Sequence, residues 1–182
     1  MTVELILEHG YEETTVEDIC RAADISRSTF FRYFPSKEDA LFGLMGETGQ
    51  QLLDALTARP SGEAPWVAMR HALEPRLGQL TEGGERVRRL IRVIVGVPAL
   101  AARHREKSAL WQALLRPEIA RRLGSDPADG TDPRADAVIA AALSCLDAAL
   151  IAWVSDENAR RLPDLLDRAM GTVSDLGPRT NG

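Results

Sequence analysis

Apolar residues recur at steps of three and four along almost the whole of this 182-residue chain. Leu52, Leu53 and Leu56 show the spacing in one segment, and Ile139 and Leu143 show it in another. Because an α-helix turns once in about 3.6 residues, such spacing gathers apolar side chains on one helical face. No segment alternates apolar and polar residues as a half-buried strand does, so the pattern predicts an all-α protein. The predicted helices span 2–9, 15–22, 26–33, 36–57, 64–80, 85–96, 98–106, 108–123, 134–155 and 161–174.

Segments rich in glycine, proline and small polar residues separate these helices. They include TARPSGEAP at 57–65, TEGGE at 81–85 and GSDPADGTDPR at 124–134. Pro98 has no amide hydrogen and clashes with a preceding helical turn, so it is expected to end the helix before it. We expect the chain to consist of a small unit at 1–45, a larger helical domain at 46–176 and a flexible tail at 177–182.

The sequence contains no pattern typical of a catalytic or metal site. His9, His71 and His104 are scattered, and no zinc-protease motif, phosphate loop, dinucleotide fingerprint or nucleophile elbow occurs. The segment SDPADGTDP spaces its aspartates by three, whereas a calcium loop alternates its ligands and ends with a glutamate. We therefore predict no enzymatic activity, no cofactor and no metal site.

Cysteine usage and hydropathy bear on the location of the protein. Cys20 and Cys145 have no metal or redox spacing, which favours two free thiols in a reducing cytoplasm. The longest apolar run, AVIAAALSCLDAALIAWV at 137–154, contains Asp147 and continues into charged sequence, so it is predicted to be a packed helix. No signal peptide opens the sequence. We expect a cytoplasmic protein without a membrane partner.

The stretch SRSTFFRYFPSKEDALF, residues 26–42, concentrates aromatic and cationic residues. It holds all four phenylalanines, one of the two tyrosines and three positive charges, although the formal net charge of the chain is -5. Ser26 is a suitable N-cap for a helix beginning at RSTFF, and Thr14 or Thr15 is a suitable N-cap for VEDICRAA upstream. The three-residue corner ADI joins the two short helices, which is the layout of a helix-turn-helix. The second helix is predicted to present Arg27, Ser28 and Arg32 on its outer side.

The aromatic residues of this unit are predicted to divide between two faces. Phe30 and Phe34 lie four residues apart and are expected to point inward, whereas Phe31 and Tyr33 are expected nearer the surface. Burial of a phenylalanine contributes about 1.5–3 kcal/mol, which a unit of this small size needs for its stability. The other inward residues are predicted to be Ile19, Ala23 and Ile25.

The segment GYEETTVEDICRAADISRSTFFRYFPSKEDAL, residues 10–41, resembles the DNA-binding domain of TetR-family transcriptional repressors position by position. The matching features are a glycine-aromatic pair, a threonine pair, an acidic-apolar helix, an Ala-Ala corner and the run Ser-x-x-Thr-Phe-aromatic-x-Tyr-Phe-x-x-Lys. The all-helical remainder agrees in length and order with the ligand-binding and dimerisation domain of that family. The resemblance implies a protein that binds double-stranded DNA, pairs with a second copy and senses a small molecule.

The resemblance also assigns DNA contacts to particular positions. An arginine at position 27 would read guanine through its paired acceptors, and the ring of Phe31 would pack on a thymine methyl group. Threonine, tyrosine and lysine at the matching positions would contact phosphates. Taken alone, each of these side chains favours a solvated face or a core position, and it is their order that favours DNA binding. The assigned residues are Thr15, Arg27, Ser28, Thr29, Phe31, Arg32, Tyr33 and Lys37.

Three features depart from the family pattern. Asp24 stands where glycine is usual, and aspartate tolerates a left-handed backbone better than most residues. Cys20 replaces a usual alanine and is expected to be buried. The sequence begins at MTVELILEHGY, without the basic arm and the complete first helix of the relatives. We hypothesise that the natural chain is longer or that its start codon lies upstream; native protein whose intact mass begins at Met1 would refute this.

The charge of residues 1–45 leaves a second interpretation open. This segment contains nine acidic and four basic side chains, whereas residues 46–182 contain 18 of each. Neutralisation of phosphates supplies much of the affinity for DNA, so a missing basic arm would weaken binding. The alternative is a ligand-sensing or interaction protein that does not bind DNA in this truncated form. Charge reversal at Arg27 and Arg32 would distinguish the two, because only a DNA-binding protein would lose its binding.

A homodimer is expected from the same resemblance. The segment AAALSCLDAAL carries small residues that let another helix approach closely, and with LPDLLDRAM it matches the family's four-helix dimer interface. Pairing would set two recognition helices about 34 Å apart on a palindromic operator. The alternative is that this apolar stripe closes the core of a single protomer. The predicted interface residues are Ile139, Leu143, Leu146, Leu150, Leu165 and Leu166.

The middle helices are predicted to bind a small apolar ligand. Their run VPALAARHREKSALWQALL resembles regulators of the mycofactocin-system type, which implies a long acyl-coenzyme A thioester. Arg103, His104, Arg105 and Arg70 would then face its phosphates or its thioester, although a solvated cationic face is the alternative. The predicted lining residues could equally fill a dry core. They are Trp66, Met69, Leu73, Ile94, Val97, Trp111, Leu114 and Trp153.

These observations together predict a dimeric repressor that blocks transcription and leaves its operator when an apolar ligand binds. Such a ligand must bind the released conformation more tightly than the DNA-bound one. The same pattern is compatible with an activator.

Overall fold

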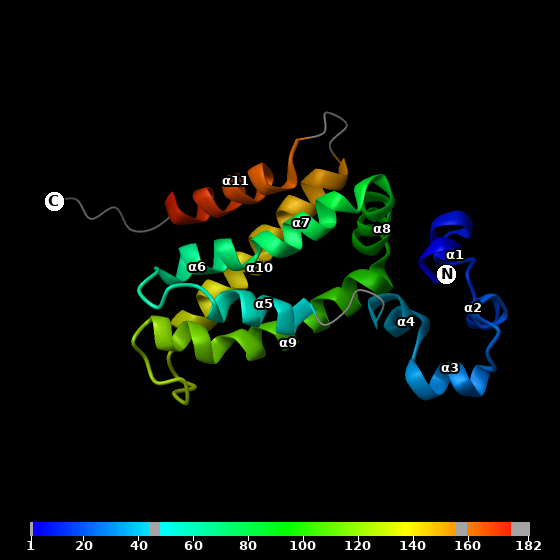
Figure 1. The fold of residues 1–182 in the computed structure, drawn as a ribbon, viewed down its shortest axis with the longest axis horizontal. Helices are drawn as coiled ribbons and strands as arrows, with labels where there is room; N and C mark the ends of the chain where they lie inside the picture. The colour runs from blue at the N-terminus through cyan, green and yellow to red at the C-terminus, as the bar shows by residue number, and fades with distance from the viewer. Residues whose placement is uncertain (1, 44–47, 156–159, 176–182) are drawn as a thin grey trace.

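The computed structural model describes residues 2–43, 48–155 and 160–175, and every regular element in these ranges is an α-helix. The all-α class predicted from the apolar spacing is therefore confirmed. Figure 1 labels the helices in chain order. The four helices at the N-terminal end are α1 (Thr2–His9), α2 (Val16–Ala23), α3 (Arg27–Tyr33) and α4 (Lys37–Gly43). The larger domain contains α5 (Thr48–Thr57), α6 (Pro65–Ala72), α7 (Glu74–Glu82), α8 (Gly84–Gly96), α9 (Pro98–Arg122), α10 (Arg134–Ser155) and α11 (Leu162–Asp175).

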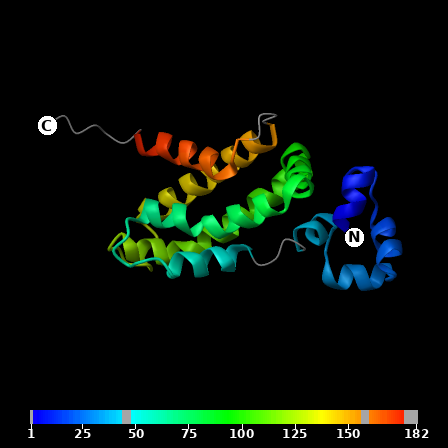
Figure 2. The same cartoon turned by 45° about the horizontal axis from the view of Figure 1, so that its top comes forward.

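Helices α1 to α4 form a small unit at one end of the molecule (Figures 1 and 2). Its own core is made of four buried side chains, with Phe30 only 1% exposed at its centre. Ser26 caps α3 as predicted, because its Oγ accepts a hydrogen bond from the backbone N–H of Thr29 at 3.1 Å. The buried core residues are Ile19, Cys20, Phe30 and Ala40.

The corner between α2 and α3 turns through a left-handed residue. Asp24 has a φ of 52° and a ψ of 46°, and it is the only described non-glycine residue with a positive φ. The backbone N–H of Ile25 then donates to the carbonyl oxygen of Cys20 at 3.0 Å and closes the turn. Left-handed backbone costs energy for residues with a Cβ atom, and aspartate is among the more tolerant of them. The residue that replaces the usual glycine therefore adopts the conformation for which glycine is suited.

Helix α10 lies at the centre of the larger domain and packs against α6, α8, α9 and α11. By length and composition it is the one described helix that could cross a membrane, with a mean hydropathy of 2.2 over its 18-residue window. Half of that window is buried inside the protein. The central helix of a bundle meets the same criteria, and its buried face accounts for the apolar run.

The small unit is joined to the larger domain through α1 and α4. Helix α1 contacts α8, and α4 contacts α9. Leu41 and Phe42 at the end of α4 belong to the same buried cluster as the core of the larger domain. Across this junction, Nε of Arg103 on α9 donates to Oδ1 of Asp39 on α4 at 3.0 Å. The orientation of the small unit therefore depends on where α8 and α9 lie.

Several helix boundaries differ from the prediction. The helix predicted at 36–57 corresponds to α4 and α5, and residues 44–47 between them lie outside the described part. The helix predicted at 64–80 is divided at Leu73, because Pro75 in the first turn of α7 has no N–H to continue the helical hydrogen bonds. The break predicted at 107 was wrong, since α9 continues through it as one helix of 25 residues.

The break predicted at Pro98 is confirmed. Helix α8 ends at Gly96, Val97 is extended with a φ of -96° and a ψ of 118°, and α9 begins at Pro98. Proline suits the first position of a helix, where its missing N–H would have no helical partner. The predicted tail at 177–182 and the predicted boundary between residues 45 and 46 lie outside the described residues.

Candidate nucleic-acid interface and internal cavity

Helix α3 has one buried face and one exposed face. Phe30 is buried, while Phe31 is 45% exposed and Tyr33 is 66% exposed. The rings of Phe30 and Phe31 meet edge to face with their centroids 5.3 Å apart, so the buried ring supports the exposed one. The division of aromatic residues predicted from the sequence is therefore seen in the structure. The exposed residues of α3 are Arg27, Ser28, Phe31, Arg32 and Tyr33.

The two arginines of α3 lie beside exposed rings. The guanidinium carbon of Arg27 is 5.7 Å from the ring centroid of Phe31, and that of Arg32 is 5.0 Å from the ring centroid of Tyr33. Arg27 also forms an ion pair with Glu17 on α2, in which the two side chains are 62% and 47% exposed. An exposed ion pair contributes little to stability, so Arg27 can exchange Glu17 for another partner at small cost.

Thr15 and Thr29 have structural partners within the small unit. Oγ1 of Thr15 accepts from the backbone N–H of Asp18 at 3.1 Å, and Oδ2 of Asp18 accepts from the backbone N–H of Thr15 at 3.0 Å, which makes a capping box for α2. Oγ1 of Thr15 also donates to Oδ2 of Asp18 at 2.6 Å. Hydrogen bonds from the hydroxyl and the backbone N–H of Thr15 hold the pKa of Asp18 below its usual range, and Arg21 adds a smaller effect in the same direction. Thr15 is exposed, whereas Thr29 is half-buried beside Ser26 with their hydroxyl oxygens 3.0 Å apart.

Lys37 ties α4 to the segment that precedes α2. Its Nζ donates to the carbonyl oxygen of Tyr11 at 2.7 Å and to that of Thr14 at 3.2 Å. The same atom lies 3.9 Å from the centroid of the Tyr11 ring. Two of the three hydrogens of the ammonium group are thus used within the protein. Sequence reasoning assigned Lys37 to a phosphate and did not identify this contact with Tyr11.

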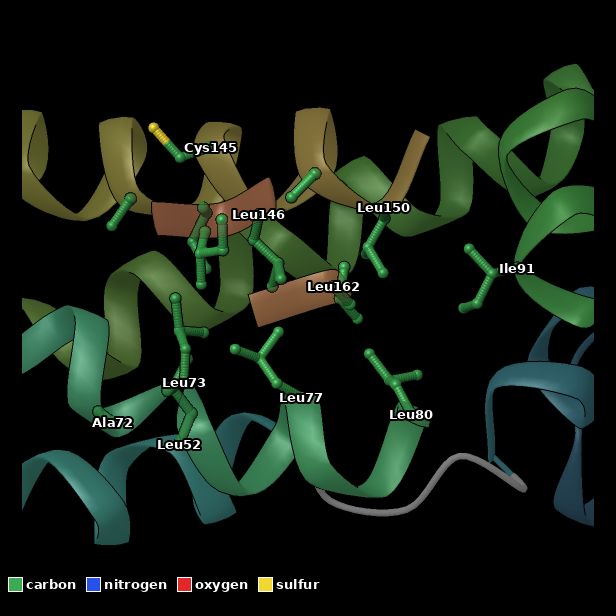
Figure 3. Packing of buried hydrophobic residues seen from close by; sticks show 14 of the residues in the cluster. Leu52, Ala72, Leu73, Leu77, Leu80, Ile91, Cys145, Leu146, Leu150 and Leu162 are labelled. Carbon is green, nitrogen blue, oxygen red and sulfur yellow. The ribbon is translucent and has the colours of Figure 1, made fainter. Parts of the chain in front are cut away.

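The larger domain encloses a cavity of about 600 Å³, which is within the usual size range of small-molecule sites. Residues of α5, α7, α8, α9 and α10 line it, together with Phe42 of α4 and Ala72 of α6. Figure 3 shows Leu80, Ile91 and Leu150 directed toward the space between α7, α8 and α10. Helix α5 approaches α9 closely at Gly49, where an added Cβ would lie 2.5 Å from Cδ1 of Trp111. The missing side chain at Gly49 therefore allows Trp111 its place in the cavity wall.

The structure brings together part of the predicted ligand site. Leu73, Ile94 and Trp111 line the cavity. Met69 is fully buried in the core, and Trp153 is buried beside Arg88, whose guanidinium carbon lies 5.8 Å from the ring centroid. The other predicted lining residues also lie outside the cavity wall: Trp66 and Val97 are half-buried against the core, and Leu114 is 37% exposed.

Two polar residues of the cavity wall, His104 and Asp147, contact each other. Nε2 of His104 is 2.9 Å from Oδ1 of Asp147. The His104 ring lies 6.5 Å from that of Phe42 and 6.1 Å from that of Trp111. His104 therefore touches both the cavity and the end of α4. The charged lining residues besides His104 are Asp54, Arg76, Arg105, Lys107 and Asp147.

The cations predicted to face a ligand are only partly found in the cavity wall. His104 and Arg105 line it, whereas Arg70 forms an ion pair with Asp167 and Arg103 forms one with Asp39. Sequence reasoning missed Arg76, although its position gave a signal. Arg76 lies three residues after Leu73 and four before Leu80, so it interrupts an apolar helical stripe with a cation.

The residues predicted at a dimer interface lie inside the protomer. Each is between 0% and 7% exposed in the single chain, and Leu146 and Leu150 line the cavity. They close the core of the protomer, which was the alternative that the sequence left open. The residues concerned are Ile139, Leu143, Leu146, Leu150, Leu165 and Leu166. The exposed face of α10 carries Ala137, Ser144, Ala148, Ile151 and Ser155, and of these Ile151 also lines the cavity.

Both cysteines lie in hydrophobic clusters, Cys20 in that of the small unit and Cys145 in that of the larger domain. Cys20 and Cys145 are both free and buried, and burial raises the pKa of the Cys145 thiol. Within the described residues, no group of three or more histidine, cysteine and acidic side chains could hold a metal ion.

Two family models match successive parts of the chain. Residues 1–43 match the family described as bacterial regulatory proteins, tetR family. Residues 63–176 match the MftR C-terminal domain. The first match contains α1 to α4, and the second contains α6 to α11.

Two curated proteins are similar to the chain in sequence. The HTH-type transcriptional regulator TcmR of Streptomyces glaucescens is 36% identical over 138 residues, which cover 72% of this chain and 61% of TcmR. A protein named as the mycofactocin biosynthesis transcriptional regulator MftR of Mycobacterium tuberculosis is 30% identical over 184 residues, which cover 97% of this chain and 85% of MftR. The alignment thus spans less than two thirds of the length of TcmR but most of the length of MftR.

Two solved structures share the fold. FadR of Thermus thermophilus, a transcriptional repressor in complex with lauroyl-CoA, has a TM-score of 0.62 and 20% sequence identity, with 100% of this chain and 93% of that chain covered. A transcriptional regulator from Aquifex aeolicus has a TM-score of 0.54 and 18% identity, with 95% of this chain and 93% of that chain covered.

Proposed function

The chain belongs to the TetR family of bacterial regulatory proteins, and we propose that it is a transcriptional repressor that a small apolar ligand releases from its operator. The observation that carries this proposal is the exposed face of α3. Arg27, Ser28, Phe31, Arg32 and Tyr33 lie together on that face above the buried ring of Phe30. Such a helix, held by a capped turn, presents side chains to the major groove of DNA.

The side chains of α3 suit two kinds of DNA contact. The guanidinium of Arg27, once it leaves Glu17, can donate to both acceptors of a guanine, and the exposed ring of Phe31 offers an apolar surface for a thymine methyl group. Arg32 and Tyr33 extend toward the end of the helix and fit phosphate contacts. Lys37 would act mainly by holding the small unit together, because its ammonium group is bound to two carbonyl oxygens.

Two copies of the chain would be needed to read a palindromic operator, since successive major grooves lie about 34 Å apart. The buried leucines of α10 and α11 are not available for pairing, whereas the outer face of α10 is. Ala137, Ser144 and Ala148 on this face are small, and Ile151, at the edge where this face meets the cavity lining, is 51% exposed. A second helix could approach such a face closely and bury the isoleucine.

Helix α9 connects the cavity with the DNA-binding unit. Adjacent residues of this helix have different partners, because Arg103 pairs with Asp39 of α4 and His104 lines the cavity. A ligand that displaces His104 would therefore shift α9 at the point where it holds α4. The resulting movement of α3 would alter the distance between the two recognition helices. The ligand releases DNA to the extent that it prefers this shifted conformation.

The ligand class that we propose is an apolar molecule such as an acyl-CoA. The leucine and isoleucine lining of the cavity supports an apolar group, and FadR of Thermus thermophilus is described in complex with lauroyl-CoA. Arg105 and Lys107 in the same wall could face the phosphates of such a ligand.

Fluorescence anisotropy with labelled DNA from upstream of the gene tests the repressor proposal. We expect salt-sensitive binding by the wild-type chain and loss of at least about tenfold in affinity for Arg27→Ala. Arg121→Ala is the matched control, since Arg121 is an exposed arginine in the last turn of α9 and should leave affinity unchanged. The end of α9 lies away from the small unit (Figure 1).

Two results would contradict the proposal. One is equal affinity of wild type and Arg27→Ala for every fragment that binds. The other is an absence of binding on fragments that tile the neighbourhood of the gene, which would favour a ligand-sensing or interaction protein that does not bind DNA.

A further inference from the structure

Arg76 differs from the other half-buried arginines in the described part of the chain because it has no protein partner. It forms no ion pair, hydrogen bond or ring contact with a described residue, although its side chain lies in the cavity wall. Every other half-buried arginine has a carboxylate or a carbonyl oxygen beside it. These pairs are Arg59 with Glu63, Arg70 with Asp167, Arg88 with the carbonyl of Trp153, Arg103 with Asp39, Arg116 with Asp136, and Arg122 with Glu118.

The surroundings of Arg76 make the missing partner costly. Leu73 and Leu80 share its face of the helical turn and line the same cavity. Burial lowers the pKa of Arg76 below its usual value, but a guanidinium remains charged at neutral pH. A desolvated charge without a counter-ion is unfavourable, so the folded protein gains free energy when an anion enters the cavity and reaches Arg76.

The other charged groups of the cavity wall do not supply this anion. Asp147 is bound to His104 at 2.9 Å, and Asp54 accepts a hydrogen bond from Gln50 at 2.8 Å. Arg105 and Lys107 add two further cations to the lining. The wall therefore carries three permanent cations, Arg76, Arg105 and Lys107, against the two carboxylates Asp54 and Asp147.

We propose that the cavity binds an amphipathic carboxylate, whose acyl chain lies along the leucine and isoleucine lining and whose carboxylate is bound by Arg76. The planar guanidinium matches a carboxylate with two parallel N–H···O hydrogen bonds. This inference rests on the ligand site of the proposed function and names the chemistry of its ligand more closely. It differs from an acyl-CoA, because the acyl carbonyl of a thioester has no charge for Arg76 to bind.

Calorimetric titration of the full-length chain without DNA tests the assignment with three probes that share one chain length. They are dodecanoate, dodecanol and lauroyl-CoA. We expect dodecanoate to bind wild type at least about tenfold more tightly than dodecanol, since a charge-assisted hydrogen bond is worth about that much. In Arg76→Gln, dodecanoate should lose this advantage while the affinity for dodecanol is kept. Arg76→Lys keeps the charge without the planar fork and should bind dodecanoate with intermediate affinity.

Arg168→Gln is the matched control, because Arg168 is an exposed arginine of α11 outside the cavity wall and its removal changes the net charge equally. It should retain the preference for dodecanoate. Retained affinity for dodecanol in Arg76→Gln shows that the cavity of that variant is intact. The proposal is overturned if wild type binds dodecanoate and dodecanol equally, if it binds neither, or if it binds only lauroyl-CoA. It is also overturned if Arg168→Gln loses as much affinity for dodecanoate as Arg76→Gln.

The same preparations, titrated against operator DNA, separate this inference from the proposed function. If the chain binds DNA but its cavity binds dodecanoate and dodecanol equally, the repressor proposal holds and the proposal of a carboxylate ligand is refuted. If the chain binds no DNA but prefers dodecanoate in a way that depends on Arg76, the carboxylate proposal holds and the repressor proposal is refuted.

Discussion

Arg103 on α9 and Asp39 on α4 are joined by a hydrogen bond of 3.0 Å from Nε to Oδ1, across the junction between the cavity domain and the small unit. The next residue of α9, His104, lines the cavity. The guanidinium of Arg103 is itself held between two carboxylates, Glu106 and Asp39, which raise its pKa above the usual value. One turn of α9 thus contacts both the ligand space and the helix that follows the recognition helix.

We predict that this ion pair couples the two parts of the molecule. In a double-mutant cycle of Arg103→Met and Asp39→Asn, urea unfolding should give a coupling energy of about 0.5–1 kcal/mol, as expected for a partly exposed pair. Affinity for operator DNA should change only a few-fold in Arg103→Met. Release of DNA by a cavity ligand should weaken, because the displacement of His104 no longer reaches α4. Additive effects of the two substitutions on stability would show that the pair does not join the units.

Lys37 should contribute more to the stability of the small unit than to its contact with DNA. Lys37→Met removes two hydrogen bonds to backbone carbonyls and the contact with the Tyr11 ring. We expect a loss of about 1.5–3 kcal/mol in the free energy of unfolding. Arg32→Met provides the contrast, because Arg32 is exposed and, among the described residues, contacts only the Tyr33 ring. It should lower DNA affinity without changing stability, and the opposite pattern in the two variants would assign Lys37 to the phosphates.

Asp24 should tolerate glycine but not a branched side chain. Its φ of 52° lies in the left-handed region, where a Cβ atom crowds the following carbonyl group. We expect Asp24→Val to lower the free energy of unfolding by about 1–2 kcal/mol. Asp24→Gly should change it by less than about 0.5 kcal/mol, because relief of strain is offset by the greater freedom of the unfolded chain. Thermal unfolding followed by circular dichroism measures both, and equal stability of the two variants would contradict this account of the corner.

The sequence was sufficient to predict the helix-turn-helix because its determinants are local. The N-cap at Ser26 and the inward position of Phe30 depend on neighbours within a few residues, and so does the helix end before Pro98 in the larger domain. The roles of Leu146 and Leu150 were not predictable in this way. An apolar stripe has the same spacing whether it faces its own core or a second copy of the chain. Which of these it does depends on the packing of helices that are distant in the sequence.

The cavity was only partly predictable for the same reason. Its lining comes from seven helices, and the choice among tryptophans depended on which of them faces an unfilled space. Trp111 lies in the wall because Gly49 leaves room for it, whereas Trp153 packs beside Arg88. Arg76 left a signal in the sequence as a cation in an apolar stripe, but the absence of a partner is a property of the folded chain.

Acid should weaken the turn between α5 and α6 through Glu63. Its carboxylate accepts hydrogen bonds from Nε and Nη2 of Arg59 at 2.8 and 2.7 Å and lies 2.8 Å from Nδ1 of His71. These contacts lower the pKa of Glu63 from 4.5 to about 2, and the hydrogen bonds from Arg59 have the largest effect. Since the unfolded chain binds the proton more readily, this contribution to stability is fully present above about pH 5 and is lost as the pH falls toward 2.

Comparing Glu63→Gln with wild type tests whether the stabilisation by the Glu63 carboxylate is lost as the pH falls. The variant should unfold at a lower temperature at pH 7, and the difference between the two proteins should shrink as the pH is lowered from 5 to 3. Glu82→Gln, which changes an exposed glutamate at the end of α7, is the control and should follow wild type throughout. A difference for Glu63→Gln that stays constant with pH would show that its carboxylate is not held by Arg59.

The outer face of α10 gives the sharpest test of pairing. Ala148 is exposed on this face, between Ser144 and Ile151. Ala148→Arg would place an unpaired charge in a close helix contact, which a dimer cannot accommodate without losing water from that charge. By sedimentation we expect the mass to fall from twice 19.9 kDa to 19.9 kDa, with the thermal stability of the protomer nearly unchanged. Operator affinity should fall with it, because a lone protomer reads one half-site. Ala113→Arg is the control, because it places the same charge on the exposed face of α9 and should leave the dimer intact. If Ala113→Arg separates the two copies while Ala148→Arg does not, the copies pair through α9 and not through α10.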